Sequence, residues 1–103
     1  MNEVDIKAML EETGLKVLYN HAKEGTKVPY ITYTTTTDNI FADDNILEKR
    51  LVLEINLYEA YRDLKIEKKL EDVLSAHKIP WNRDESYDSE SKVFIEIYET
   101  EVI

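Results

Sequence analysis

The segment Glu48–Tyr58, EKRLVLEINLY, carries the strongest secondary-structure signal in the chain. Alternate positions place four aliphatic side chains on one face of an extended strand: Leu51, Leu53, Ile55 and Leu57. The opposite face is mixed, because Val52 and Tyr58 stand there among charged and amide side chains. The alternation predicts a strand with one face in the core and the other partly in water and partly against another surface.

Two segments with helical spacing lie on either side of this strand in the sequence. In Asn2–Thr13 the apolar residues Ile6, Met9 and Leu10 recur at helical intervals, acidic residues occupy the first turn, and Gly14 follows as a stop signal. Asp63–Lys78 has its apolar stripe and one histidine at Ile66, Leu70, Val73, Leu74 and His77. Both segments are predicted to be helices, and Pro80 prevents the second from continuing.

The remaining segments supply further strand signals. Leu15–Tyr19 and Tyr30–Thr36 are rich in residues that favour strands, and Ile79–Trp81 predicts a short extended segment. Asn82–Ser91 is interpreted as a polar hinge or hairpin tip, followed by a last strand, KVFIEIYETEVI, with apolar residues on both faces. This order predicts a single α+β domain over residues 1–103, with a mostly antiparallel sheet of four to five strands and two helices packed on one face.

Composition limits the classes of partner. The chain has 103 residues, 22 acidic and 13 basic side chains, a formal net charge of −9 and no cysteine. Its field repels phosphate backbones and anionic lipid, so we predict binding to neither nucleic acid nor membrane. No apolar run reaches the length of a membrane span, and the first residues do not resemble a signal peptide, which predicts an unexported, soluble protein. The acidity suits a partner with a basic face, or it only keeps the chain soluble.

Residue patterns for catalysis or cofactor binding are absent from the sequence. His21 and His77 have no sequence neighbours that complete a metal or acid–base motif, and Gly14 and Gly25 stand too far apart for a phosphate-binding loop. We therefore predict a protein that is not an enzyme, with no catalytic, cofactor-binding or metal-binding residues.

The segment DNIFADDN, Asp38–Asn45, predicts a polar turn around two large apolar residues. Its acids and amides suit local turn hydrogen bonds. A second interpretation is binding of Ca²⁺ or Mg²⁺ by their oxygens, but the spacing differs from that of an EF-hand loop. A third interpretation is a contact loop, in which a partner covers the apolar side chains. We predict an interface made by Asp38, Asn39, Ile40, Phe41, Asp43 and Asp44 of this loop with Tyr33, Tyr58 and Tyr61, although tyrosines are also common as half-buried sheet residues.

Several segments taken together resemble small proteins encoded in the tail-assembly regions of long-tailed phages and prophages. They are VPYITYTTTTDNIFADDN (residues 28–45), KRLVLEINLYEAYRD (49–63), EKKLEDVLSAHKI (67–79) and FIEIYETEVI (94–103). The chain thus resembles the tail-terminator or tail-completion group, which includes proteins described as minor capsid proteins. The resemblance implies an α+β domain that assembles into a homo-oligomeric, hexameric ring at the head–tail junction. The implied partners are the phage tail tube and the head connector, and the implied location is the virion, assembled in the host cytoplasm.

A different class also fits the composition. A small acidic protein can imitate DNA and occupy the basic groove of a nucleic-acid enzyme. Such a mimic is expected to lose affinity steeply as salt rises, whereas a contact made through apolar residues is expected to persist. An enzyme would require His21 or His77 to meet two carboxylates in a concave site.

Overall fold

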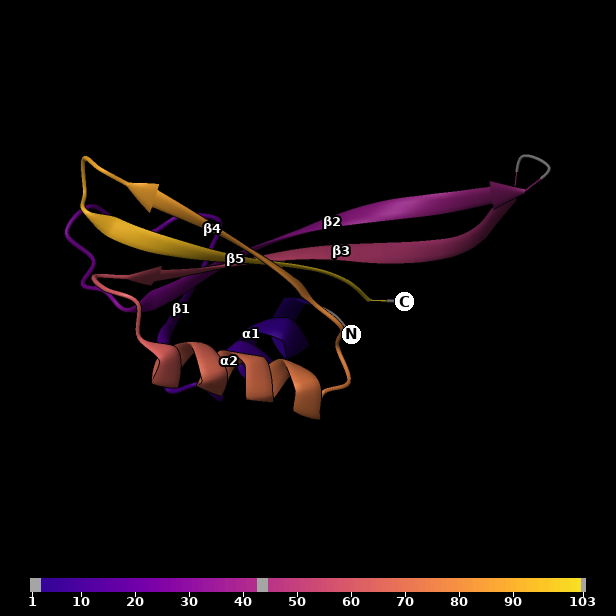
Figure 1. Cartoon of the computed structure of the whole chain (residues 1–103). Coiled ribbons are helices and arrows are strands. Elements are labelled where there is room, and N and C mark those ends of the chain that lie inside the picture. The colour runs from indigo at the N-terminus through magenta and orange to yellow at the C-terminus, as the bar shows by residue number, and fades with distance from the viewer. Residues whose placement is uncertain (1–2, 43–44, 103) are drawn as a thin grey trace.

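The computed structural model describes the backbone of residues 3–42 and 45–102 and the side chains of residues 4–37 and 51–101. The elements follow the order α1 (Glu3–Glu11), β1 (Lys16–Tyr19), β2 (Tyr30–Ala42), β3 (Asn45–Glu59), α2 (Leu64–Ala76), β4 (Asn82–Asp88) and β5 (Val93–Val102) (Figure 1). The predicted α+β class, with a mostly antiparallel sheet and two helices, is confirmed. No helix in the described ranges is long and apolar enough to cross a membrane.

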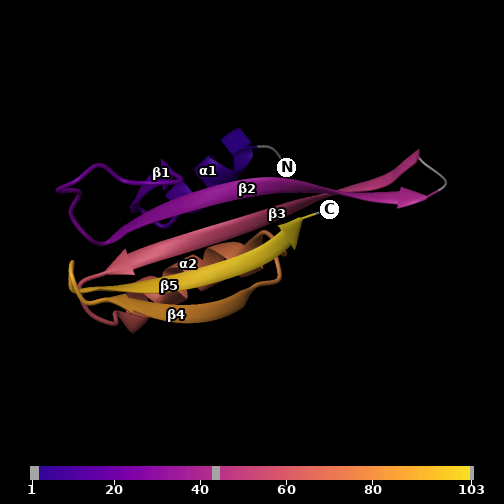
Figure 2. The ribbon, with the colours of Figure 1, turned by 90° about the horizontal axis from the view of Figure 1, so that it is seen from above.

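The five strands form one mixed sheet in the order β1-β2-β3-β5-β4 (Figure 2). β1 pairs with β2 in parallel, and the other three neighbouring pairs are antiparallel. Because β5 lies between β3 and β4, helix α2 connects two strands that run in the same direction. The last strand of the chain therefore occupies an interior position in the sheet, as its two apolar faces predict.

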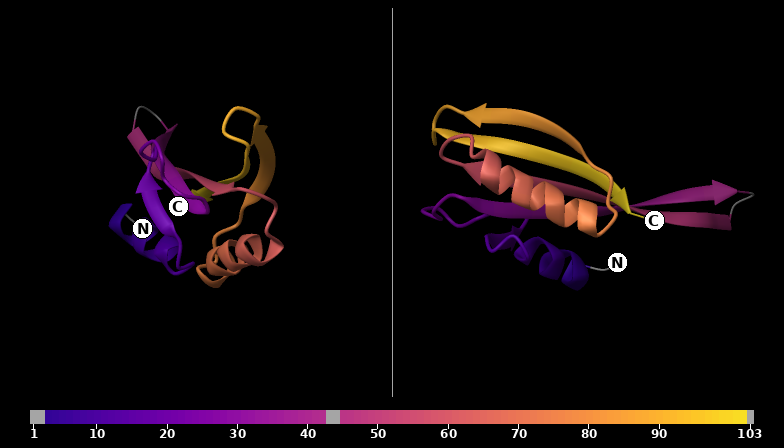
Figure 3. Two further views of the ribbon diagram at one scale, coloured as in Figure 1. Left: turned by 90° about the vertical axis from the view of Figure 1, so that its left-hand side faces the viewer. Right: turned by 60° about the horizontal axis from the view of Figure 1, so that its bottom comes forward.

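The core lies between the sheet and the two helices, which Figures 1 and 3 show on the same side of the sheet. As the alternation of residues in β3 predicted, Leu53, Ile55 and Leu57 point into the core and are fully buried. Tyr98 of β5 is also fully buried, and its hydroxyl donates a hydrogen bond to Glu71 of α2 at 2.7 Å. The core cluster is completed by residues of both helices and the neighbouring strands: Ile6, Met9, Leu10, Val17, Ile31, Tyr33, Leu70, Leu74 and Ile79.

Two predicted boundaries are wrong. Ile79–Trp81 is not a strand, and Asn82–Asp88, predicted as part of a polar hinge, is β4. Every residue of β4 is exposed, and the strand has no apolar alternation by which the sequence could have indicated it. It forms because it pairs with Val93–Glu99 of β5 at one edge of the sheet. Charged residues are common at such edges because they discourage pairing with other chains.

Asp63 starts α2 by capping its first turn. Its carboxylate accepts hydrogen bonds from the backbone N–H groups of Lys65 and Ile66, at 3.1 and 3.3 Å. We expect Asp63→Ala to lower the free energy of unfolding by about 1 kcal/mol, because two N–H groups lose their partner. Urea denaturation measures this loss, and Asp63→Asn, which keeps an acceptor oxygen, is the control. Equal stability of Asp63→Ala and the wild type would contradict this role of the cap.

Candidate functional site

The β2–β3 hairpin projects beyond the rest of the sheet (Figures 1 and 2). β1 pairs only with Tyr30–Tyr33 of β2, and β5 pairs with Leu51–Glu59 of β3. Asp38–Ala42 and Asn45–Arg50 pair with each other and with no other strand in the described ranges. We call these two segments the ribbon. The radius of gyration is 14.9 Å, against about 13 Å for a compact chain of this length, because the ribbon lengthens the molecule.

The ribbon is a two-stranded structure with two open edges. A hairpin of two strands has little stability in water by itself, and its open edges present N–H and C=O groups to another strand. The register shifts between Ile40 and Phe41, so that Leu47 is the extra residue of a bulge in β3. Bulges bend a strand and increase its twist. The open edges are suited to pairing with a second chain, and the bulge locally interrupts the β3 edge.

The predicted loop at Asp38–Asn45 is wrong for most of its length. Asp38, Asn39, Ile40 and Phe41 belong to β2, which continues to Ala42. Asp43 and Asp44 lie outside the described residues. Weak strand propensity in Asp and Asn is overridden because the backbone pairs with β3 across the hairpin. Ile40 and Phe41 thus lie in the ribbon, where the sequence predicted a turn.

The three tyrosines of the predicted interface lie in different environments. Tyr33 is 4% exposed and belongs to the core, so it does not offer its ring to a partner. Tyr58 is half-buried, on the face of the sheet opposite the helices, and Tyr61 is 66% exposed after the end of β3. Of the three predicted tyrosines, only Tyr58 and Tyr61 are therefore accessible to a partner in the single chain.

The face of the sheet opposite the helices carries a second candidate surface. Tyr30 and Tyr58 stack there with ring centroids 4.6 Å apart, and register places Ile95 of β5 beside Tyr58. A hollow of about 720 Å³ adjoins this stack, between the loop 22–28 and the turn after β4. Lys23 and Lys27 line it together with Glu24 and Asp88, so its rim is not of one charge. Apolar and polar side chains are mixed on this face, as the sequence of β3 predicted.

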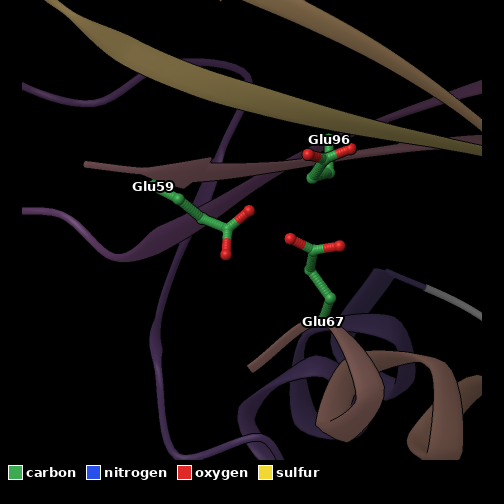
Figure 4. A group of neighbouring side chains, drawn as sticks. All are labelled: Glu59, Glu67 and Glu96. Atoms are coloured by element: carbon green, nitrogen blue, oxygen red, sulfur yellow. The ribbon is translucent and has the colours of Figure 1, made fainter. Parts of the chain in front are cut away.

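A cluster of charged side chains lies under the sheet at the start of α2 (Figure 4). Glu59 ends β3, Glu67 lies in α2 and Glu96 lies in β5, and all three are at most 2% exposed. Carboxylate oxygens of the three lie within 4.8 Å of one another. Arg62 and Arg83 supply the opposing positive charge. We call these five residues the Glu–Arg cluster.

Most hydrogen bonds in the Glu–Arg cluster go to Glu67. Arg62 donates from Nε and Nη2 to the two oxygens of Glu67, at 2.9 and 2.8 Å, and Arg83 donates to Oε1 at 2.7 Å. Glu96 Oε1 is 2.8 Å from Arg62 Nε, but that N–H points to Glu67. Glu96 thus gains an ion pair without a hydrogen bond among the described residues. Glu59 accepts one hydrogen bond, from the N–H of Asp63 at 3.0 Å.

The surroundings move the pKa values of the three carboxyls apart. Burial and the neighbouring carboxylates raise the pKa of Glu59 to about 8. Burial and the charge of Glu67 raise the pKa of Glu96 to about 7. The hydrogen bonds from Arg62 lower the pKa of Glu67. At neutral pH Glu59 therefore holds a proton, and the two guanidinium groups face two carboxylates when Glu96 is ionised.

The ion pairs of the Glu–Arg cluster join α2 to the neighbouring strands. The three glutamates are close enough to share a cation, but Arg62 and Arg83 already supply positive charge to oxygens of Glu67 and Glu96. The sequence contained a signal that the prediction missed. Glu59 follows Leu53, Ile55 and Leu57 at alternate positions of β3, so its side chain points to the same buried face of the sheet.

The histidines lie apart from this cluster. His77 is the C-cap of α2, as its place at the helix end predicted, and its Nε2 lies 2.8 Å from Glu12 Oε2 after α1. His21 is exposed in the loop after β1. Neither histidine meets two carboxylates among the described contacts. No protein-family model and no curated protein matches this chain.

Proposed function

We propose that the chain is a structural protein of phage or prophage virion assembly, a tail-terminator or tail-completion component that forms a ring at the head–tail junction. The observation that carries the proposal is the ribbon, which projects from the folded body with two open strand edges. The order of segments in the sequence, which resembles that protein group, supports the same assignment. The proposed partners are further copies of the chain, the tail tube and the head connector.

The distribution of stabilising contacts supports this division of roles. The body has its own core, a capped helix and the Glu–Arg cluster, whereas the ribbon adds length without a further strand on either side. A segment whose two strands pair only with each other among the described residues is suited to contacts between copies. A subunit of a cyclic ring needs two different complementary patches, and a ribbon with two distinct edges has them.

Sedimentation velocity over a range of protein concentrations tests the proposal. We expect association to increase with protein concentration and to persist or strengthen as salt rises, because salt screens the repulsion between copies of net charge −9. Binding to purified tail tubes is the second measurement. A chain that stays monomeric and binds neither tubes nor connector contradicts the proposal. Salt-sensitive binding to a basic nucleic-acid enzyme would favour the DNA-mimic alternative instead.

Ile40 and Phe41 provide a test by substitution. We expect Ile40→Ser with Phe41→Ser to weaken association by roughly tenfold or more, because two large apolar side chains no longer leave water at the contact. The matched control is Val4→Ser with Leu64→Ser, since these side chains are 77% and 69% exposed on the helices. Sedimentation measures association, and circular dichroism checks the fold. Unfolding of the first variant would instead place Ile40 and Phe41 in the core of the single chain.

A further inference from the structure

We propose that neighbouring copies join by pairing their ribbons, with the β2 edge of one ribbon against the β3 edge of the next. The partner at this surface is thus a second copy of the chain, and repetition around a ring closes the ribbons into a barrel. The inference rests on the proposed function and specifies which surfaces meet. The two edges are Thr36–Ala42 of β2, which is the β2 segment of the ribbon with the two residues before it, and Asn45–Arg50 of β3.

The direction of the strands favours this pairing. Within one ribbon β2 and β3 are antiparallel. When copies are related by rotation about one axis, every β2 runs the same way, so β2 of one copy meets β3 of the next in antiparallel orientation. Antiparallel pairs are the more stable kind, and closure leaves no strand edge open. A two-fold contact of β2 with β2 would leave both β3 edges unpaired.

The lengths and the composition of the edges agree with this contact. The β2 edge has seven residues and the β3 edge has six, so they can pair over nearly their full length. The far end of the ribbon, Asn39–Ala42 and Asn45–Leu47, contains no charged residue among those described. β4, at the other side of the sheet, carries Arg83, Asp84, Glu85 and Asp88 in seven exposed residues. The charges discourage pairing at β4, whereas the described part of the ribbon carries charged residues only at its base, at Asp38 and Glu48–Arg50.

Single cysteines introduced into the full chain test this contact, because the natural sequence has none. Asn39 and Lys49 are register partners, and Thr37 lies two residues from Asn39 on the same face. We expect Asn39→Cys or Thr37→Cys, mixed with Lys49→Cys and oxidised, to give several-fold more covalent dimer than any variant alone. Opposed antiparallel residues lie at about the Cα separation that a disulfide requires. Leu64→Cys, exposed on α2, measures random collision.

Each outcome decides between interpretations. If a β2 variant alone forms as much covalent dimer as the mixture, the proposed pairing of β2 in one copy with β3 in the next is overturned. Rings without a mixed cross-link also overturn it but leave the proposed function intact, whereas a monomeric wild-type chain overturns both. A shortened variant provides a second measurement, in which Asn-Gly replaces residues 38–50 and joins the paired residues Thr37 and Leu51 in a tight turn. We expect it to fold and to lose association, and retained association would contradict the inference.

Discussion

Replacement of Arg62 by methionine is expected to lower the free energy of unfolding by about 3–5 kcal/mol at pH 7. Arg62 makes ion pairs with Glu67, Glu85 and Glu96, and two of these carboxylates are at most 2% exposed. Its loss leaves buried negative charge that Arg83 alone compensates. Because a buried charge without its partner costs more than the pair contributes, this change is expected to exceed that of any surface substitution.

The pH dependence of this loss distinguishes charge from packing. Between pH 7 and pH 5 the carboxyl of Glu96 gains a proton, because its pKa is about 7, whereas Glu59, with a pKa of about 8, is protonated at both. Less negative charge then remains unpaired, so the loss is expected to shrink. Urea denaturation at the two pH values measures it, with Lys65→Met on the exposed side of α2 as the control. An equal loss at both pH values would show that Arg62 acts through its apolar stem.

Glu59→Gln is expected to stabilise the protein in alkaline solution by about 1–3 kcal/mol. Burial raises the pKa of Glu59 from 4.5 to about 8. A raised pKa means that the contribution of this group is complete below pH 4.5 and is lost as the pH rises through 8. Glutamine stays neutral throughout, and its amide still provides an oxygen for the N–H of Asp63 and donors for Glu67.

The measurement is the free energy of unfolding from pH 5 to pH 9. The wild type is expected to lose stability over this range, and Glu59→Gln is expected to lose less, with the largest difference at pH 9. Glu90→Gln, in the exposed turn after β4, is the matched control. Parallel curves for the wild type and Glu59→Gln would contradict the protonated state of Glu59. Glu67 acts in the opposite sense, because hydrogen bonds lower its pKa and its contribution is lost as the pH falls below 4.5.

Periodicity predicted the parts of the fold that bury apolar side chains. The alternation around Leu53 and Ile55 and the helical stripe with Leu70 and Leu74 both correspond to buried surfaces. Such patterns can be recognised in the sequence because the residues that face the core are apolar and recur at regular intervals. β4 has no such pattern, since all of its residues are exposed and its formation depends on β5.

The candidate sites were less predictable for two physical reasons. The ribbon strands are held by backbone pairing across the hairpin, which the side chains of Asp38 and Asn39 do not reveal. The Glu–Arg cluster joins residues from four elements and from the loop before α2, and sequence separation hides their proximity. The alternation of residues in β3 could have placed Glu59 on the buried face, but only the assembled sheet brings Glu96 beside it.

The folded body and the ribbon therefore have different roles in this account. The Glu–Arg cluster fixes α2 against β3 and β5, and it holds the body as one unit while the ribbon extends from it. A stable body with an open-edged extension is suited to repeated addition of identical subunits. No reactive group takes part in such a role.

Electron microscopy of the purified chain of residues 1–103, at raised protein concentration and moderate salt, is the most direct test of ring assembly. We expect closed rings with one uniform number of subunits. Particles of the size of a single chain under all of these conditions, with no density added to the ends of tail tubes, would contradict it.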